Sequence, residues 1–108
     1  MRAGQRTQAD NICFHVQQAV EKYVKALLVQ NRIGFPKTHS IRELIALLPA
    51  SDVPNLEDAI QDRLTDYAVV VRYPGEEEQI SLQEADESLR IARRVRTFFR
   101  KRLAEEGA

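Results

Sequence analysis

The sequence has 108 residues, of which 44% are hydrophobic, and this combination fits one modest globular domain and excludes a disordered chain. Lys plus Arg and Asp plus Glu number 16 each, so net charge does not support attraction of the whole protein to nucleic acid or an anionic membrane. Because Cys13 is the only cysteine and no membrane span or signal peptide is recognisable, we expect a cytoplasmic protein without internal disulfides or membrane association.

The stretch from Ile12 to Leu28 predicts the helix around which the rest of the chain packs. Turned at 100° per residue, its apolar side chains cover roughly 200° of the circumference, so this helix needs neighbours on both sides. Asp10 or Asn11 is expected to cap its start, and Gly34 to end it in a left-handed conformation. The apolar arc consists of Ile12, Val16, Ala19, Val20, Tyr23, Val24, Ala26, Leu27 and Leu28.

Two more helices are predicted in the middle of the chain. Ser40 and Glu43 have the spacing of a capping box and open a short helix of about two turns. A third helix is predicted from about Leu56 to Val71, with Ser51 or Asn55 as its N-cap. Its expected core face comprises Leu56, Ala59, Ile60, Leu64, Tyr67, Val70 and Val71.

The last helix is predicted to follow Ser81 and Glu84, which repeat the capping-box spacing. Short links between long helices favour antiparallel neighbours. The expected fold class is therefore all-α, an antiparallel up-and-down bundle with three long helices and one short helix. We expect a frayed lead at residues 1–9, the domain at residues 10–104 and a tail at residues 105–108. The apolar stripe of the last helix is Leu82, Ala85, Leu89, Ala92, Val95, Phe99 and Leu103.

Three short motifs occur in a fixed order. They are QQAVEKYVKALL at Gln17–Leu28, KTHS at Lys37–Ser40 and VRYPG at Val71–Gly75. In this order and spacing the chain, over about residues 10–103, resembles the HEPN domain family. The resemblance implies a helical bundle that is frequently a homodimer and is often encoded beside a minimal nucleotidyltransferase as a toxin–antitoxin-like pair. Many members of the family are RNA-cleaving toxins.

The sequence departs from this family in two respects. Family members usually carry another long helix before the first motif, whereas about ten polar residues precede it here. We therefore expect half of the apolar arc to lie uncovered within one chain, and either a second chain to cover it or a longer parent protein to supply the lost helix. RNA-cleaving members pair an Arg with a His four to six residues later, but Arg72 is followed at that spacing by Glu76, Glu77 and Glu78. The expected function is therefore a non-catalytic interaction module.

The candidates for ligand or partner binding come from two motifs. Glu21 and Lys25, four residues apart, have a simple interpretation as an ion pair on a solvated helix face, and the alternative is a packed polar contact or an interface. Arg72 can cap the end of the third helix or bind phosphate. The ligand- or partner-binding candidates are Gln18, Glu21, Lys22, Lys25, Arg72 and Tyr73.

The catalytic alternatives depend on His39. We favour a structural hydrogen bond for its ring, with metal-independent RNA cleavage by His39 and Arg72 as the alternative. Nucleotide binding through Lys22, Lys25 and Arg72 is a third hypothesis. No metal site, cofactor or sequence-specific DNA binding is predicted. Basic residues on the last helix are interpreted as its solvated face, with non-specific RNA binding as the alternative; they are Arg90, Arg93, Arg94, Arg96, Arg100, Lys101 and Arg102.

Overall fold

A computed structural model describes residues 7–69 and 80–107 of the chain. The predicted all-α fold is confirmed, because the regular structure of these residues is entirely helical. Val70, Val71 and the VRYPG motif lie outside the described residues. The elements are α1 (Gln8–Gln30), α2 (Ile41–Ala46), the 3-10 turn η1 (Ala50–Asp52), α3 (Asp58–Asp66), the 3-10 turn η2 (Tyr67–Val69) and α4 (Leu82–Gly107).

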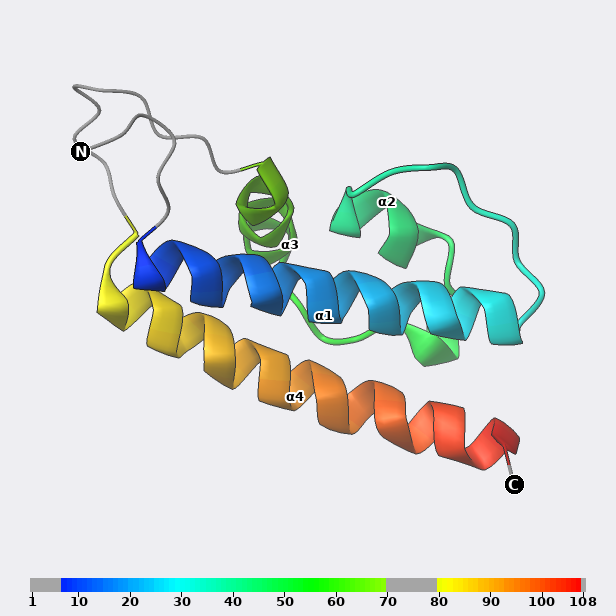
Figure 1. The fold of residues 1–108 in the computed structure, drawn as a ribbon. Helices are drawn as coiled ribbons and strands as arrows, with labels where there is room; N and C mark the ends of the chain where they lie inside the picture. Colours follow the sequence, from blue (N-terminus) through cyan, green and yellow to red (C-terminus); the bar gives the residue numbers. More distant parts are fainter. Residues whose placement is uncertain (1–6, 70–79, 108) are drawn as a thin grey trace.

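The two long helices lie side by side and run in the same direction, while α2 and α3 pack on the other side of α1 (Figure 1). Cys13 Sγ lies 3.5 Å from Ser88 Oγ, 75 positions further along, and the rings of Tyr23 and Phe99 stack with 6.2 Å between centroids. The two contacts join residues that are 75 and 76 positions apart in the sequence, and such a nearly constant separation means that the two helices are parallel. The expectation of antiparallel neighbours is therefore wrong for α1 and α4, because the intervening segment with α2 and α3 returns the chain to its starting end.

The start of α1 is fixed by Thr7, so the predicted caps Asp10 and Asn11 are wrong. The Asp10 N–H donates to Thr7 Oγ1 at 3.1 Å, and the Thr7 N–H donates to Asp10 Oδ2 at 3.0 Å. This reciprocal pair is a capping box in which Asp10 is the third helical residue. Its carboxylate also complements the positive end of the helix.

The end of α1 is a Schellman motif built on Arg32 instead of Gly34. Arg32 has φ 58° and donates its N–H to Val29 O at 3.0 Å, while the Ile33 N–H donates to Leu28 O at 2.9 Å. The prediction that Gly34 supplies the left-handed residue is wrong, because the motif places that residue two positions after the last helical residue. Ile33 then packs against the core.

The predicted start of α2 is confirmed, but only one half of its capping box forms. Ser40 Oγ accepts the Glu43 N–H at 3.2 Å, whereas the Glu43 carboxylate accepts the Thr38 hydroxyl at 3.0 Å. The Ser40 N–H donates to Thr38 Oγ1 at 3.0 Å. The Thr38 hydroxyl therefore bridges Ser40 and Glu43 by hydrogen bonds and stiffens the loop before α2.

The third helix is shorter than predicted and begins later. It starts at Asp58 with Glu57 as an N-cap that makes no side-chain bond, so neither Ser51 nor Asn55 caps it. The carbonyls of Ser51 and Asn55 instead accept hydrogen bonds from arginines of α4, which hold this segment against the last helix. Ala59, predicted in the core, is exposed.

The apolar arc of α1 is largely covered within one chain, by α4 on one side and by α2, α3 and η2 on the other. The expectation that half of it is uncovered is therefore wrong, although Ala26 is exposed and Ile12, Ala19 and Tyr23 are only half-buried. The fully buried members are Val16, Val20, Val24, Leu27 and Leu28.

On α4 the predicted stripe is confirmed except at its first residue. Ser81 Oγ accepts the Glu84 N–H at 3.0 Å, as predicted, but Leu82 is 66% exposed. A residue in the first turn lies beyond the surface that α1 covers. Ala85, Val95 and Phe99 are buried, and Leu89, Ala92 and Leu103 pack at the edge of the core. None of the described helices is both long and apolar enough to span a membrane.

Candidate functional site

A buried carboxylate lies at the centre of the candidate site. Glu21 occupies the middle of α1, at the border of its apolar arc, and its side chain is only 9% exposed. The loop before α2 covers it, and that loop is anchored where the Ile41 N–H donates to Thr65 Oγ1 of α3 at 2.9 Å. Of the two interpretations that the sequence allows, the packed polar contact therefore fits Glu21 and the solvated helix face does not, because the loop returns over it.

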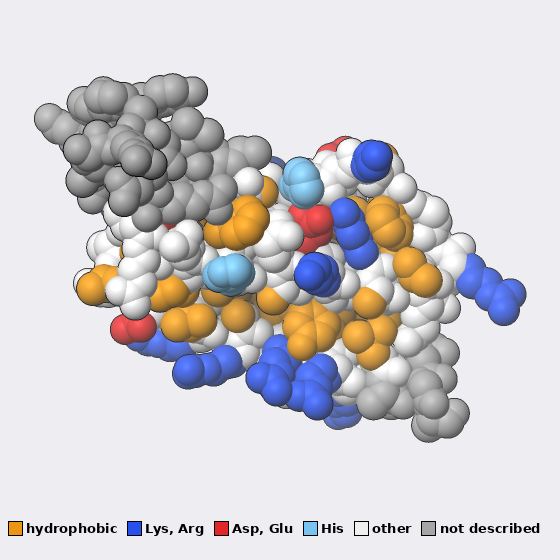
Figure 2. Space-filling view, viewed as in Figure 1, with side chains coloured by type: hydrophobic (Ala, Val, Ile, Leu, Met, Phe, Trp, Pro, Cys, Tyr) orange, Lys and Arg blue, Asp and Glu red, His pale blue; other side chains and the backbone are white. Residues whose placement is uncertain are grey.

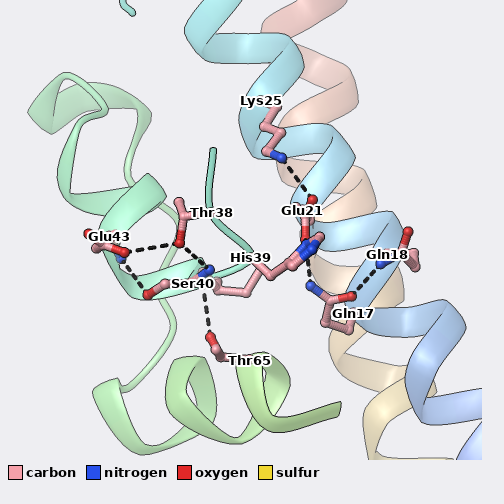
Figure 3. A network of polar contacts seen from close by, with 10 residues as sticks. Gln17, Gln18, Glu21, Lys25, Thr38, His39, Ser40, Glu43 and Thr65 are labelled. Atoms are coloured by element: carbon pink, nitrogen blue, oxygen red, sulfur yellow. Dashed lines mark hydrogen bonds and ion pairs between the residues drawn. The ribbon is translucent and has the colours of Figure 1, made fainter. Parts of the chain in front are cut away.

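Three side chains donate hydrogen bonds to Glu21 (Figure 3). Glu21 Oε1 accepts from Gln17 Nε2 at 2.7 Å and from His39 Nδ1 at 2.9 Å, while Oε2 accepts from Lys25 Nζ at 2.9 Å. An ionised carboxylate has no proton to donate, so the proton of this contact is on His39 Nδ1. We call Gln17, Glu21, Lys25 and His39 the Glu21 network.

The network holds the Glu21 carboxylate in its charged form. Burial alone raises the pKa of this carboxyl, but the hydrogen bonds from Lys25, His39 and Gln17 outweigh burial and bring the pKa below its usual 4.5. Glu21 is therefore ionised at neutral pH. A charge taken out of water is tolerated here because every side of the carboxylate has a donor.

His39 connects the network to solvent. Its side chain remains 64% exposed although Nδ1 is held by the buried carboxylate, so the other edge of the ring faces outward. In neutral imidazole with the proton on Nδ1, Nε2 carries a lone pair that can accept a proton. The predicted structural hydrogen bond exists, and it joins the loop to α1 instead of closing the loop on itself.

The other predicted residues of the helix lie around this network. Gln18 Nε2 donates to Gln17 Oε1 at 2.7 Å, and Lys25 Nζ lies 5.7 Å from the ring centroid of Phe35. Lys22 is exposed beside them. Arg72 and Tyr73 lie outside the described residues, so the structure does not test them.

Gln17 is the network residue that sequence reasoning missed. It is 0% exposed and lies four residues before Glu21, on the same side of α1. The i, i+4 spacing that drew attention to Glu21 and Lys25 applies equally to Gln17 and Glu21. Extending that search one turn toward the helix start identifies it.

A second polar cluster lies between α1, η2 and α4. Tyr67 Oη donates to Glu84 Oε2 at 2.5 Å, and Cys13 Sγ contacts Ser88 Oγ. Burial raises the pKa of the Tyr67 phenol, and the Glu84 hydrogen bond raises it further. Burial also raises the pKa of the Cys13 thiol, so this cysteine is a poor nucleophile. In the described part of the chain, no three His, Cys, Asp or Glu side chains converge as a metal site requires.

Basic side chains gather along the edge of the molecule formed by α4 (Figure 2). Arg90, Arg93 and Arg100 are exposed, as the sequence predicts. Arg94 and Arg102 have additional roles, because Arg94 donates to Asn55 O at 3.2 Å and Arg102 to Ser51 O at 3.1 Å. The helix therefore combines a solvated basic face with two arginines that hold the preceding segment.

Comparison with known proteins gives one match. The family model described as HEPN domain matches residues 4–103, nearly the whole chain. No curated protein and no solved structure matches the chain significantly.

Proposed function

Because the chain belongs to the HEPN domain family, we propose that it is a non-catalytic helical interaction module. It acts as a homodimer and as the partner of a minimal nucleotidyltransferase-like protein in a toxin–antitoxin-like pair, as the family implies. The observation that carries this proposal is the Glu21 network. The polar groups of this network bond to one another and hold a loop against α1. This structural role accounts for their presence in the motifs without a substrate.

The surface of α1 supports the homodimer. Ile12, Ala19 and Tyr23 are half-buried and Ala26 is exposed, all on the flank of α1 away from the Glu21 network. Small and aromatic side chains along one helix flank allow close approach of a second helix. This flank is what remains of the arc after α4 on one side and α2, α3 and η2 on the other have covered the rest.

Two measurements test the proposal. Light scattering after size exclusion is expected to give a dimer mass at micromolar concentration, and Ala26→Glu is expected to shift it to a monomer. Ala59→Glu, the same change at an exposed alanine of α3, is the control. Co-expression with the product of an adjacent nucleotidyltransferase reading frame is expected to yield a stable complex. A monomer that binds no such protein contradicts the proposal.

RNA cleavage is the second candidate, and one observation favours it. Glu21 holds His39 in the tautomer whose exposed nitrogen can accept the proton of a ribose 2′-hydroxyl, and Arg72 then stabilises charge on the phosphate. The test is degradation of labelled RNA in the presence of EDTA. Loss of a measured activity in both His39→Ala and Arg72→Ala supports cleavage, whereas activity that survives both substitutions excludes this pair.

Nucleotide binding through Lys22, Lys25 and Arg72 has less support. The Lys25 ammonium is bound to Glu21 at 2.9 Å, so a nucleotide phosphate competes with a buried carboxylate for it. A thermal-shift titration with ATP tests this hypothesis directly, and we expect no change in melting temperature.

A further inference from the structure

A pocket lies between α4 and the segment that joins η1 to α3. Its volume is about 260 Å³, below the range of about 300–1,000 Å³ typical of small-molecule sites, and it suits one or two side chains. We call it the α4 pocket. Its lining is Pro54, Asn55, Leu56, Arg94, Val95 and Phe98.

The walls of the α4 pocket are already held in place. The Leu56 N–H donates to Pro54 O at 2.9 Å, and Arg94 donates to Asn55 O at 3.2 Å. On the opposite wall, the Arg102 guanidinium carbon lies 3.5 Å from the ring centroid of Phe98. Because these groups are bonded before any ligand arrives, a bound segment does not have to order them.

The α4 side of the pocket rim is basic. From Ser88 to Leu103, α4 contains seven basic residues and no acidic residue. Arg90 precedes Arg94 by four residues and Lys101 follows Phe98 by three, so both lie on the pocket side of the helix, and both are exposed. Asp52, the carboxylate before the wall segment, is already engaged by Arg102 at 3.4 Å.

We propose that the α4 pocket docks an acidic segment of the partner protein. One aliphatic side chain of that segment sits against Leu56, Val95 and Phe98, and carboxylates beside it pair with Arg90, Arg94 and Lys101. This inference rests on the proposed interaction function and adds to it the surface and the chemistry of the bound segment. The flank of α1 that supports the homodimer is a separate surface.

The lining favours a protein segment over RNA. Pro54, Leu56 and Val95 are aliphatic, whereas sequence-tolerant binding of single-stranded RNA depends on stacking of bases on open aromatic faces. Phe98 is the only aromatic ring of the lining. Arg102 covers one of its faces, and it makes an edge contact with Phe99 at 5.2 Å between centroids. The pocket therefore combines an aliphatic floor with basic residues along its α4 side.

The experiment uses fluorescence anisotropy with the full chain and three labelled short peptides. The first is rich in Asp and Glu around one central Leu, the second has Ser in place of that Leu, and the third has Lys in place of Asp and Glu. The first peptide is expected to bind at least about tenfold more tightly than either of the others. Arg94→Glu is expected to weaken its binding by at least about tenfold, and Lys101→Glu by a smaller factor.

Arg63→Glu is the matched control, because it makes the same change at an exposed residue of α3 and is expected to leave peptide binding unchanged. Circular dichroism confirms that each variant is folded. Equal binding of the Leu and Ser peptides, no binding at about 1 mM protein, or no effect of Arg94→Glu overturns the proposal. Stronger binding of labelled single-stranded RNA than of the acidic peptide, also lost in Arg94→Glu, overturns it in favour of RNA.

Failure of the pocket and failure of the proposed function give different results. If a nucleotidyltransferase-like partner co-purifies equally with the wild type and with Arg94→Glu, the interaction function stands and the α4 pocket is not its surface. If the acidic peptide binds as expected but no such partner co-purifies, the pocket stands and its partner is a different acidic protein.

Discussion

Replacement of Glu21 by Gln tests whether the Glu21 network holds the fold together. The substitution keeps size and one acceptor oxygen, but its new NH₂ group faces a donor, either Lys25 or the pair Gln17 and His39. A buried donor left without an acceptor costs about 1–3 kcal/mol. Lys25 and His39 are 28% and 64% exposed, so water compensates part of their loss. We expect a net destabilisation of about 1–2 kcal/mol.

Urea unfolding followed by circular dichroism measures this loss, and thermal unfolding is expected to show a decrease of about 4–16 °C in Tm. The matched control is Glu87→Gln, which makes the same change at an exposed carboxylate of α4 and is expected to alter stability by less than about 0.5 kcal/mol. If Glu21→Gln is no more harmful than Glu87→Gln at neutral pH, the reasoning is refuted.

The pH dependence of Glu21→Gln supplies a second criterion. The folded-state pKa of Glu21 lies below its usual 4.5, so the ionised carboxylate stabilises the fold fully above that pH. This stabilisation is lost as the pH falls below 4.5 and through the lowered pKa. The stability difference between wild type and Glu21→Gln is therefore expected to shrink in acid. A difference that is the same at about pH 3 as at about pH 7 contradicts the assignment.

Three further predictions follow from single residues. Arg32→Gly is expected to stabilise the protein by about 0.5–1 kcal/mol in urea unfolding, because Arg32 has φ 58° and glycine adopts this conformation without steric cost. The Cys13 thiol is expected to react with iodoacetamide at mildly alkaline pH only after denaturation, since burial raises its pKa; rapid labelling of folded protein contradicts this. Tyr67→Phe is expected to cost about 1–2 kcal/mol. In wild type, the phenol of the unfolded chain ionises above about pH 10 before the phenol of the folded protein does, so stability is expected to fall there. Tyr67→Phe is expected to remove this fall, which urea unfolding at a series of pH values measures.

Helix existence was predictable here because the apolar spacing persists over several turns of α1 and α4, and residues such as Val20 and Phe99 are buried where the pattern places them. The direction of α4 was not predictable. A helical pattern identifies which face is buried but contains no information on whether the partner helix runs up or down. The left-handed residue at the end of α1 was not predictable for a similar reason. Residue preference favours Gly34, but the Schellman motif places the left-handed residue, Arg32, at a fixed distance from the last residue of α1.

The candidate site was predictable only where its residues share one helix. Glu21 and Lys25 are visible as an i, i+4 pair, and Gln17 belongs to the same series. His39 comes 18 residues after Glu21, and its contact depends on a loop that folds back over α1. This loop covers Glu21, so the ion pair that the sequence suggests on the surface is part of a buried network.

The parallel pairing of α1 and α4 gives this helical domain an unusually non-local contact map. Contacts such as Cys13 with Ser88 span 75 residues, and the entropy of closing such a loop is about 2 kcal/mol more unfavourable than that of a five-residue hairpin connection. High contact order slows folding, so the domain is expected to fold more slowly than helical bundles whose neighbours are joined by short turns. On the ribosome, α1 is synthesised long before α4, and its apolar arc stays accessible to chaperones until the last helix emerges.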